Sequence, residues 1–589
     1  MSELKRELVI PEDDLPKPKD LLAEGRELSQ TVIVGSCPFL TTYNVRSEGE
    51  YKQQRIAEGE IMFHGQIGYR SLTKSQRAYS AIYEKLSEAG YRIDRYGICL
   101  DWSMGYPASH RANMPRGTGL ILEKTEDFIS LTHSAPVAPH FGDFVIGTPA
   151  AVENTIHALK AGATTIGNLG QYFNFRMPKW TNDVFTTTET VKAIALCANQ
   201  SVEILIHSNL DDGFAALFHD MTCSIGAVLL ERYIVEDLIG GFVSHCYGHT
   251  YSDPLTRFAF QRALAHVTKT LGSMVYGNTT IYGAREIENY ANLASYLLVD
   301  IIAQQTLPTG HGINPVPVTE AMHIPEINEI VDVHLFAHQL VERAEGFEEM
   351  LNVEAVRKIS NKLIQGGQLF KKQVLIGLKE AGININNPVE LLLALRRVGA
   401  KRLEELFGPG ELHDVQLGKR IPVVQATTIT TLEKRSEEIA SSFSESDHKK
   451  LRNSGLKVSV ACTDVHEYGK IILEEVLKRL GIEVIDVGVS VDPNIVAKIA
   501  GASESDFIAI STYSGIALTY LESLYQEMSK LNLRIPVLIG GKLTQIPNNS
   551  TSSKPIDVTD LLASLGAIVC HSIEDVIENL LKRAQEKYN

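Results

Sequence analysis

Residues 457–481 read KVSVACTDVHEYGKIILEEVLKRLG, and this stretch contains one full repeat of the pattern that decides the fold. A short apolar run, a polar turn and an amphipathic stretch ending in glycine predict a buried strand, a loop and a helix. Three further pairs of a predicted strand and a predicted helix continue this alternation to the C-terminus. They are IEVIDVGV and NIVAKIAGA, DFIAIST and ALTYLESLYQEMSKLN, and PVLIGG and SIEDVIENLLKRAQEK. We therefore expect residues 456–589 to form a small, doubly wound, Rossmann-like (flavodoxin-like) α/β domain that binds ligands at the carboxyl ends of its strands.

A longer alternation of the same kind precedes this domain. Between residues 141 and about 330, short apolar runs such as FVIG, ATTIGN, VEILIHSN and NPVPVTE each precede a helical pattern. This spacing predicts βα units that close into a (β/α)8 TIM-like barrel, with its chemistry at the C-terminal mouth. Polar residues recur at the ends of the predicted strands: Asn168, His207, Asn209, His245, Tyr247, Asn278 and Glu320. Each of them alone would be typical of a loop, but their recurrence at successive strand ends favours a barrel.

These patterns divide the chain into three parts. Residues 1–432 would hold the barrel, which is the catalytic and substrate domain, with a polar N-terminal extension over 1–30 and a helical region over 331–405. The serine-rich stretch 433–455 is typical of a linker or an exposed helix, and we place the domain boundary there. The remaining residues, 456–589, would form the second domain.

Composition narrows the class of protein. The chain has 589 residues with 56 basic and 71 acidic side chains, a net charge of −15 and no basic block, which argues against duplex DNA as a partner. It has no run of about 18 apolar residues and no apolar leader at its charged N-terminus. Its seven cysteines form no CxxC pair, which argues against a disulfide scaffold or a local zinc site. We expect a cytoplasmic enzyme without membrane or nucleic-acid partners, assembled as a homo-oligomer, a dimer.

The predicted loop after strand 456–462 carries the most informative motif, D-x-H-x-x-G, formed by Asp464, His466 and Gly469. A neutral imidazole on a loop can ligate a metal, and a carboxylate on its other nitrogen fixes the tautomer and raises its basicity. The motif in isolation would more simply be a helix-capping aspartate beside a surface histidine. Here, however, Ser511 follows Gly469 after 41 residues, and Gly540-Gly541 follows Tyr513 after 26 residues, both at predicted strand ends.

These three elements resemble the cobalamin-binding domain of B12-dependent mutases and methionine synthase, whose fingerprint is D-x-H-x-x-G, S-x-L and G-G. Tyr513 stands here where the fingerprint has leucine. The resemblance implies that His466 is the lower axial ligand of cobalt and that Asp464 supports it. The remaining motif residues would surround the nucleotide tail of the cofactor: Gly469, Ser511, Tyr513, Gly540 and Gly541.

The barrel sequence resembles, more loosely, the glutamate mutase and 2-methyleneglutarate mutase group. The resemblance rests on Gly147-Thr148-Pro149, on residues 168–174 (NLGQYFN) and on residues 318–325 (VTEAMHIP). It implies adenosylcobalamin as the cofactor and Glu320 as the partner of the adenosyl ribose. Three positions differ from the family. Val316 stands in place of a lysine, Ile146 in place of an arginine and Asn168 in place of a glutamate.

Because substrate-reading positions differ, glutamate itself is a doubtful substrate, and other residues must be considered for substrate binding. A guanidinium can bind a carboxylate through two hydrogen bonds, and Arg176 is the first choice for this role. The other arginines considered are Arg70, Arg111 and Arg116. For each of the four arginines a structural or surface role is about as plausible. Candidates to orient substrate or act as a general acid are His207, His245, Tyr247 and Tyr282.

The function predicted from the sequence is an adenosylcobalamin-dependent radical mutase, an isomerase that rearranges the carbon skeleton of a small carboxylic acid. A corrinoid-dependent methyltransferase is one alternative, although the barrel region lacks the cysteine pair expected of a thiol-activating zinc site. A non-catalytic cobalamin-binding protein is the other alternative. The size of the barrel and its many polar strand ends argue against it.

Overall fold

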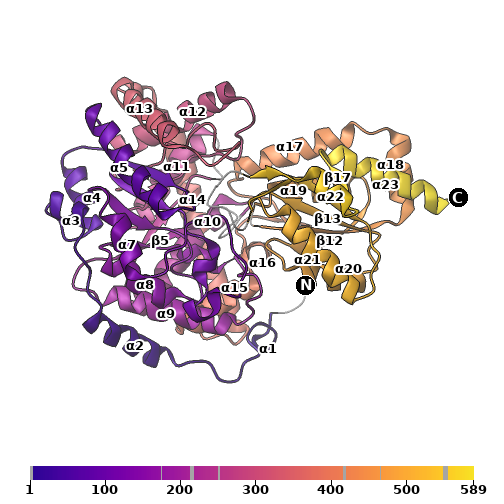
Figure 1. Cartoon of the computed structure of the whole chain (residues 1–589), viewed down its shortest axis with the longest axis horizontal. Coiled ribbons are helices and arrows are strands. Elements are labelled where there is room, and N and C mark those ends of the chain that lie inside the picture. Colours follow the sequence, from indigo (N-terminus) through magenta and orange to yellow (C-terminus); the bar gives the residue numbers. More distant parts are fainter. Residues whose placement is uncertain are drawn as a thin grey trace. The chain divides into compact units, whose positions relative to one another are not determined.

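The computed structural model describes residues 4–588 except 174, 212–217, 250–252, 415–418, 465 and 548–554. It divides into two compact units (Figure 1). Unit 1 comprises residues 1–174 and 181–427, and unit 2 comprises residues 175–180 and 428–589. None of the helices described in either unit combines the length and the apolar character needed to cross a bilayer.

Unit 1 is built on eight parallel strands. Their order in the sheet is β6-β5-β4-β3-β2-β1-β8-β7, and a parallel bridge between Tyr247 and Val275 brings β6 next to β7. The strands are β1 (Met62–Ile67), β2 (Arg95–Ile98), β3 (Ala138–Phe141), β4 (Thr165–Ile166), β5 (Leu205–Asn209), β6 (Phe242–Cys246), β7 (Met274–Val275) and β8 (Gly312–Ile313). The expected barrel is thus confirmed as a nearly closed, eight-stranded parallel sheet.

A helix follows each of these strands, which completes eight βα units. These helices are α5 (Leu72–Glu88), α7 (Thr125–Thr132), α8 (Ala151–Lys160), α9 (Asp183–Ala198), α10 (Met221–Arg232), α11 (Pro254–Val267), α12 (Glu286–Thr306) and α13 (Ile327–Arg343). Residues that point outward from the strands pack on this ring. Phe63 and Ile313, for example, share a cluster with Leu297 of α12 and Val333 of α13.

Two of the expected strands lie elsewhere. The third strand is Ala138–Phe141, whereas FVIG at 144–147 forms turns in which Phe144 and Gly147 have positive φ. The eighth strand ends at Ile313, and the expected strand NPVPVTE at 314–320 follows it as loop and turn. Prolines at 315 and 317 have no N–H to donate to a neighbouring strand, which explains the early end.

The N-terminal end of the barrel is filled by α4 (Glu48–Ala57). Its Lys52 is buried and donates hydrogen bonds to the carbonyls of Gly272, Ser273 and Gly310, at 2.7, 3.1 and 2.6 Å. Because these carbonyls immediately precede β7 and β8, one side chain of α4 ties the starts of two strands together. Burial lowers the pKa of Lys52 to about 8, and the nearby Glu48 carboxylate opposes that shift.

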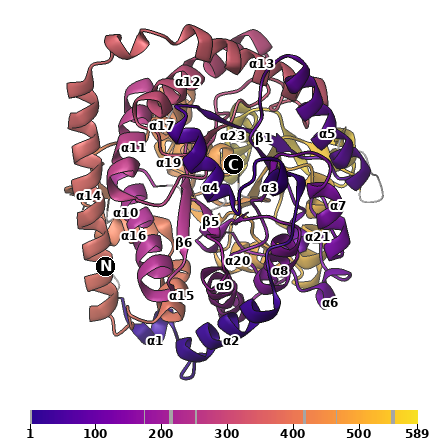
Figure 2. The same ribbon diagram turned by 90° about the vertical axis from the view of Figure 1, so that its left-hand side faces the viewer.

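The expected helical region after the barrel contains α14 (Val353–Glu380), α15 (Pro388–Val398) and α16 (Ala400–Phe407). Helix α14 runs along α10 and α11, as Figure 2 shows. A short β9–β10 hairpin (Leu412–Asp414 and Lys419–Arg420) follows. The remaining α-helices described in unit 1 lie before β1 or between strands: α1 (Arg6–Val9), α2 (Pro18–Thr31), α3 (Pro38–Thr42) and α6 (Ala108–Arg111).

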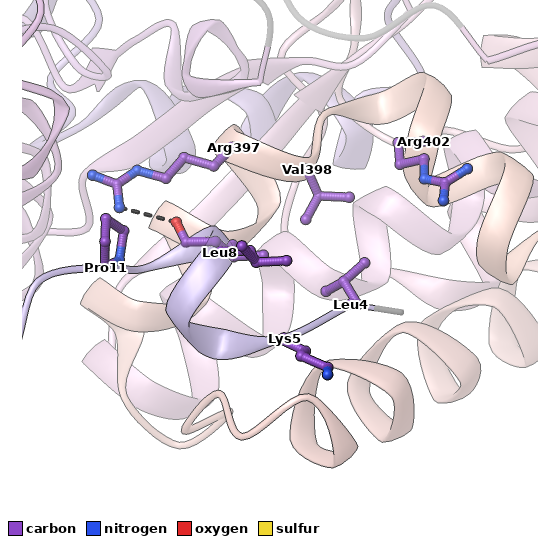
Figure 3. A pocket seen from close by; sticks show the side chains of 8 residues that line it. Leu4, Lys5, Leu8, Pro11, Arg397, Val398 and Arg402 are labelled. Atoms are coloured by element: carbon purple, nitrogen blue, oxygen red, sulfur yellow. Dashed lines mark hydrogen bonds between the residues drawn. The ribbon is translucent and has the colours of Figure 1, made fainter. Parts of the chain in front are cut away.

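The N-terminal extension packs on α15. Arg397 donates to the carbonyl of Val9 at 3.0 Å and forms ion pairs with Glu12 and Asp183, both at 2.7 Å. The extension and Arg397 line a cavity of about 460 Å³ (Figure 3). None of the site residues expected from the sequence lines this cavity.

Unit 2 is a five-stranded parallel sheet in the order β12-β11-β13-β14-β17, the order of a flavodoxin-like doubly wound fold. One apolar cluster joins the sheet to α18, α19 and α23, and another joins it to α20, α21 and α22. The strands are β11 (Lys457–Cys462), β12 (Glu483–Gly488), β13 (Phe507–Thr512), β14 (Val537–Gly541) and β17 (Ile568–Cys570). The helices are α19 (Tyr468–Arg479), α20 (Pro493–Ala502), α21 (Ala517–Lys530), α22 (Thr559–Ser564) and α23 (Ile573–Tyr588).

The stretch 433–455, expected as a linker or an exposed helix, is made up mostly of the second half of α17 (Thr427–Ser441) and of α18 (Glu445–Ser454). Leu451 is buried in the core of unit 2, and Ile439 packs against the same cluster. These contacts place both helices in unit 2. A small β15–β16 pair (Thr544–Gln545 and Ile556–Asp557) completes this unit.

Candidate functional site

The motif residues of unit 2 meet at one edge of its sheet. In the parallel register Cys462 lies beside Ser511, and Ser511 lies beside Gly540. The loop after β11 therefore leaves the sheet directly next to the ends of β13 and β14. Residues separated by more than 40 positions in the sequence are brought together, as the predicted topology requires.

Asp464 is the anchor of this edge. It is 4% exposed, and its Oδ1 accepts hydrogen bonds from the His466 backbone N–H at 2.9 Å and from His466 Nδ1 at 2.6 Å. Its Oδ2 accepts from the backbone N–H groups of Tyr513 and Ser514, both at 3.1 Å. One carboxylate thus joins the loop after β11 to the loop after β13.

The charge state of this pair follows from the contacts of Asp464. Burial alone would raise the pKa of Asp464, but His466 and the hydrogen-bond donors around the carboxyl lower it to about 2. The carboxylate is therefore ionised at neutral pH and accepts the proton on Nδ1 of His466. In the neutral imidazole this arrangement places the lone pair on Nε2, the form in which histidine binds a metal.

Ser514 Oγ lies 3.3 Å from Nδ1 of His466, and two further side chains form a stack on its ring. The Tyr513 ring stacks on the imidazole with a centroid distance of 4.4 Å and an interplanar angle of 30°. The Lys542 ammonium lies 3.9 Å from the centre of the Tyr513 ring. His466 keeps 38% of its side-chain surface exposed.

The glycines of the motif keep the edge open. A Cβ on Gly469 would have only the Ser511 hydroxyl within 4 Å, at 3.1 Å, so the start of α19 leaves room beside β13. Gly541 has a φ of +99°, which L-residues with side chains rarely adopt, and a Cβ on Gly540 would lie 2.9 Å from the carbonyl of Cys570. The hydroxyl of Thr512 at this edge is buried without a hydrogen-bond partner. These features fit a bulky polar cofactor tail.

Unit 1 has a separate group of polar residues at the carboxyl ends of its strands. Tyr276, just after β7, donates its hydroxyl to Glu320 Oε1 at 3.3 Å. Helix α13 is capped by Glu326 together with Glu329, so Glu320 does not cap it. Glu320 lies in a turn after β8, beside Tyr276, and not at the end of a strand as expected.

Cys99 lies at the same ends of the strands, at the end of β2, which is separated from β8 only by β1. It directly follows β2, and Gln66 Nε2 donates to its Sγ at 2.9 Å. Burial, together with the charges of Asp143 and Glu320, raises the pKa of the Cys99 thiol to about 12. Burial also raises the pKa of Asp143 to about 6, and Asn168 Nδ2 lies 3.5 Å from Asp143 Oδ1.

A chain of polar contacts runs from the filled end of the barrel to this mouth. Arg95 forms an ion pair with Glu48 at 2.8 Å and donates to Nδ1 of His64 at 3.1 Å. His64 Nε2 lies 3.0 Å from Gln66 Oε1. Because a guanidinium only donates, Nδ1 of His64 must accept, so Nε2–H donates to Gln66. The amide N–H of Gln66 is thereby turned toward Cys99.

The structure places His245 and Tyr247 away from the mouth. His245 Nε2 contacts the Glu231 carboxylate of α10 at 3.0 Å, and the Tyr247 hydroxyl bonds to Gln261 of α11. Both side chains therefore point outward to the helices. Successive residues of a strand face opposite sides of the sheet, and a position at the end of a strand does not by itself determine which side.

Two other predicted polar residues have different surroundings. Nδ1 of His207 lies 2.6 Å from Ser273 Oγ, which in turn accepts from Arg95, so His207 belongs to the polar interior of the barrel. Burial and the Arg95 charge hold its pKa well below the usual value of 6.5. The Tyr282 hydroxyl donates to the carbonyl of Val316 at 3.2 Å.

The candidate arginines are dispersed. Arg176 lies in the segment 175–180, which is grouped with unit 2. Arg111 lies near Glu153, at 3.8 Å, and near two main-chain carbonyls. Arg70 follows β1 and is 8% exposed; burial lowers its pKa, and the nearby charge of Arg116 adds to this effect.

Several residues of these two sites were missed from the sequence. Gln66, Cys99 and Asp143 lie at or just after the ends of β1, β2 and β3, three strands whose limits the sequence analysis did not predict, and neither motif nor periodicity singled them out. Lys542 directly follows the Gly540-Gly541 pair. Its contact with Tyr513 depends on how two loops meet and could not be predicted from its position alone.

The comparisons with known proteins concern unit 2. The family model described as the B12 binding domain matches residues 457–560. Among solved structures, a novel cobalamin-binding protein from Desulfitobacterium hafniense DCB-2 shows 20% identity over 22% of this chain, with a TM-score of 0.18. This chain spans 60% of the length of that protein. Residues 457–560 are a B12-binding domain, and they contain every residue of the motif around Asp464 and His466.

Proposed function

We propose that the protein is an adenosylcobalamin-dependent mutase that rearranges the carbon skeleton of a small carboxylic acid. The observation that carries the proposal is the 2.6 Å contact between Asp464 and Nδ1 of His466 at a strand end of the B12-binding domain. A nearly closed parallel barrel in the same chain supports catalysis over simple binding, since such barrels hold substrates at their C-terminal mouth.

In unit 2 the chain's own residues would bind and orient the cofactor. His466 would give its Nε2 to cobalt, and Asp464 would hold the imidazole in the required tautomer. Ser511 and the glycines at 469, 540 and 541 would accommodate the nucleotide tail. Bound adenosylcobalamin supplies radical chemistry through homolysis of its cobalt–carbon bond.

In unit 1 the mouth of the barrel would hold the substrate and keep water away from it. Glu320 would accept hydrogen bonds from the adenosyl ribose. For the substrate carboxylate, Arg70 and Arg116 are better supported than Arg176, because their guanidinium groups lie near each other in the barrel unit. An anion between them would relieve the repulsion of two like charges.

Electron paramagnetic resonance of the full chain loaded with adenosylcobalamin tests this function. Adding glutamate, 2-methyleneglutarate or a related acid should produce a cob(II)alamin signal coupled to an organic radical. Transfer of a methyl group from methylcobalamin, with no radical signal from any acid, would instead identify a corrinoid methyltransferase. Cobalamin binding without either reaction would identify a carrier or regulator.

The assignment of His466 has its own test. The cob(II)alamin form of protein grown on ¹⁵N-histidine should show nitrogen hyperfine coupling that changes with the label. Coupling that does not change with the label would mean that the benzimidazole of the cofactor remains bound to cobalt.

The homodimer stays a prediction, which light scattering on the purified chain would check.

A further inference from the structure

The end of the sheet in unit 2 carries a three-layer stack of side chains, of which the cobalamin fingerprint specifies only the histidine. The layers are the imidazole of His466, the ring of Tyr513 and the ammonium of Lys542, and they come from the loops after β11, β13 and β14. The ring centroids are 4.4 Å apart, and Lys542 Nζ is 3.9 Å from the centre of the tyrosine ring.

The backbone holds each layer in place. The same Asp464 carboxylate accepts from the backbone N–H of Tyr513 and from Nδ1 of His466, so the two rings share one anchor. The backbone N–H of Lys542 donates to the carbonyl of Thr512 at 2.8 Å, which fixes the lysine beside the residue that precedes Tyr513.

The stack controls a degree of freedom that Asp464 leaves open. A hydrogen bond to Nδ1 fixes one atom of the imidazole, but the ring can still tilt about that bond. The lone pair of Nε2 lies in the plane of the ring, so the tilt decides where a metal bound to Nε2 would sit. The Tyr513 ring, parallel to within 30°, restricts this tilt.

Lys542 has a corresponding effect on Tyr513. The tyrosine side chain is 41% exposed, so burial alone does not hold its ring in one orientation. An ammonium over the face of the ring is attracted by its quadrupole and favours the orientation that stacks on His466. A leucine at position 513 would neither present a flat face to the imidazole nor attract the ammonium.

We propose that Tyr513 and Lys542 are positioning residues that hold the plane of the His466 imidazole for ligation of cobalt. The proposal rests on His466 being the cobalt ligand, as proposed above. It adds that the departure from leucine at position 513 is coupled to the lysine after Gly540-Gly541. The two residues act together on the geometry of the ligand and not on the fold.

The test uses the full chain loaded with cobalamin, labelled with ¹⁵N-histidine, and four variants. Tyr513→Leu should lower the ratio of histidine-bound to histidine-free cob(II)alamin about 2- to 12-fold, the range expected for loss of one aromatic contact. Tyr513→Phe should retain the ratio, because it keeps the ring. Lys542→Met should lower it about 2- to 5-fold. Lys530→Met is the matched control, since Lys530 of α21 contacts Glu527 at the surface, and it should change nothing.

The melting temperature of each cobalamin-free variant separates positioning from folding and should stay at the wild-type value. Wild-type ratios in both Tyr513→Leu and Lys542→Met would overturn the proposal, as would an equal loss in Tyr513→Phe and Tyr513→Leu. Absence of label-dependent coupling in the wild type itself would refute the assignment of His466, and with it the proposal. The wild-type spectrum thus tests the ligand, and the variants test its positioning.

Discussion

Asp464→Asn removes a negative charge from the centre of the unit 2 site while preserving its size. The folded protein lowers the pKa of this carboxyl from 3.8 to about 2. Each pKa unit corresponds to about 1.36 kcal/mol, so the ionised form is favoured by ~2.4 kcal/mol through His466 and the backbone donors. Both oxygens of Asp464 accept hydrogen bonds, so the side-chain NH2 group of an asparagine would face a donor, either at His466 or at the backbone N–H groups of Tyr513 and Ser514. We therefore expect cobalamin affinity to fall by about 10- to 100-fold, the usual cost of losing a carboxylate behind a metal-bound histidine.

The assay is an absorbance titration of the full chain with cobalamin at several pH values. Because the folded pKa lies below the unfolded value, the stabilisation is present above about pH 4 and is lost only as the pH falls through about 2. Asp464 keeps its charge between pH 5 and 8, so the variant should bind cobalamin more weakly than the wild type at every pH in that range. Asp506→Asn is the matched control, since Asp506 accepts the backbone N–H of Lys457 at 2.9 Å, at the start of the same strand. Equal affinities for wild type and Asp464→Asn, or equal losses in both variants, would refute the reasoning.

Three further predictions concern the barrel. Glu320→Gln should keep its melting temperature and slow homolysis of the cobalt–carbon bond more than it weakens cobalamin binding, as stopped-flow absorbance would show; a lower melting temperature with normal homolysis would remove Glu320 from the active site. Asp143→Asn should melt higher than the wild type at pH 8 and nearly equal to it at pH 4, because burial raises the pKa of Asp143 to about 6 and its ionisation destabilises the fold as the pH rises through that value. Lys52→Met should lower the free energy of unfolding by about 3–5 kcal/mol, since it leaves the buried Glu48 with one cation fewer, and denaturant titration would measure this; a change below 1 kcal/mol would contradict the role given to Lys52.

The parts of the fold that depend on periodicity could be predicted from the sequence. The alternation of strands and helices indicated both sheets, and the motif at Asp464 and His466 indicated which edge of the second sheet binds a ligand. The limits of individual strands were harder to predict. An apolar run such as FVIG reads as a strand, although in the structure its residues make a turn with positive φ at Phe144.

The side chains at the barrel mouth were only partly predictable, for a geometric reason. His245 and Tyr247 are two residues apart and therefore share a face of β6 and its continuation, and that face is the one covered by α10 and α11. The sequence did not reveal which face was inside. Conversely, Gln66 owes its orientation to two other residues. His64 lies two positions earlier on the same strand, and Arg95, which bonds to His64, lies on the neighbouring strand β2. Such chains of contacts depend on register, which a single sequence does not specify.

The filling of the barrel by α4 has a consequence for any reactive species formed inside it. Among the described residues, the buried Lys52 of α4 is bonded to three carbonyls at the amino ends of β7 and β8 and so covers the barrel axis from that side. An unpaired electron at the opposite end would be shielded by protein on that side. A lid over the carboxyl ends of the strands would then be sufficient to protect it, and loss of the Lys52 contacts should shorten the lifetime of such a species even where the mouth itself is intact.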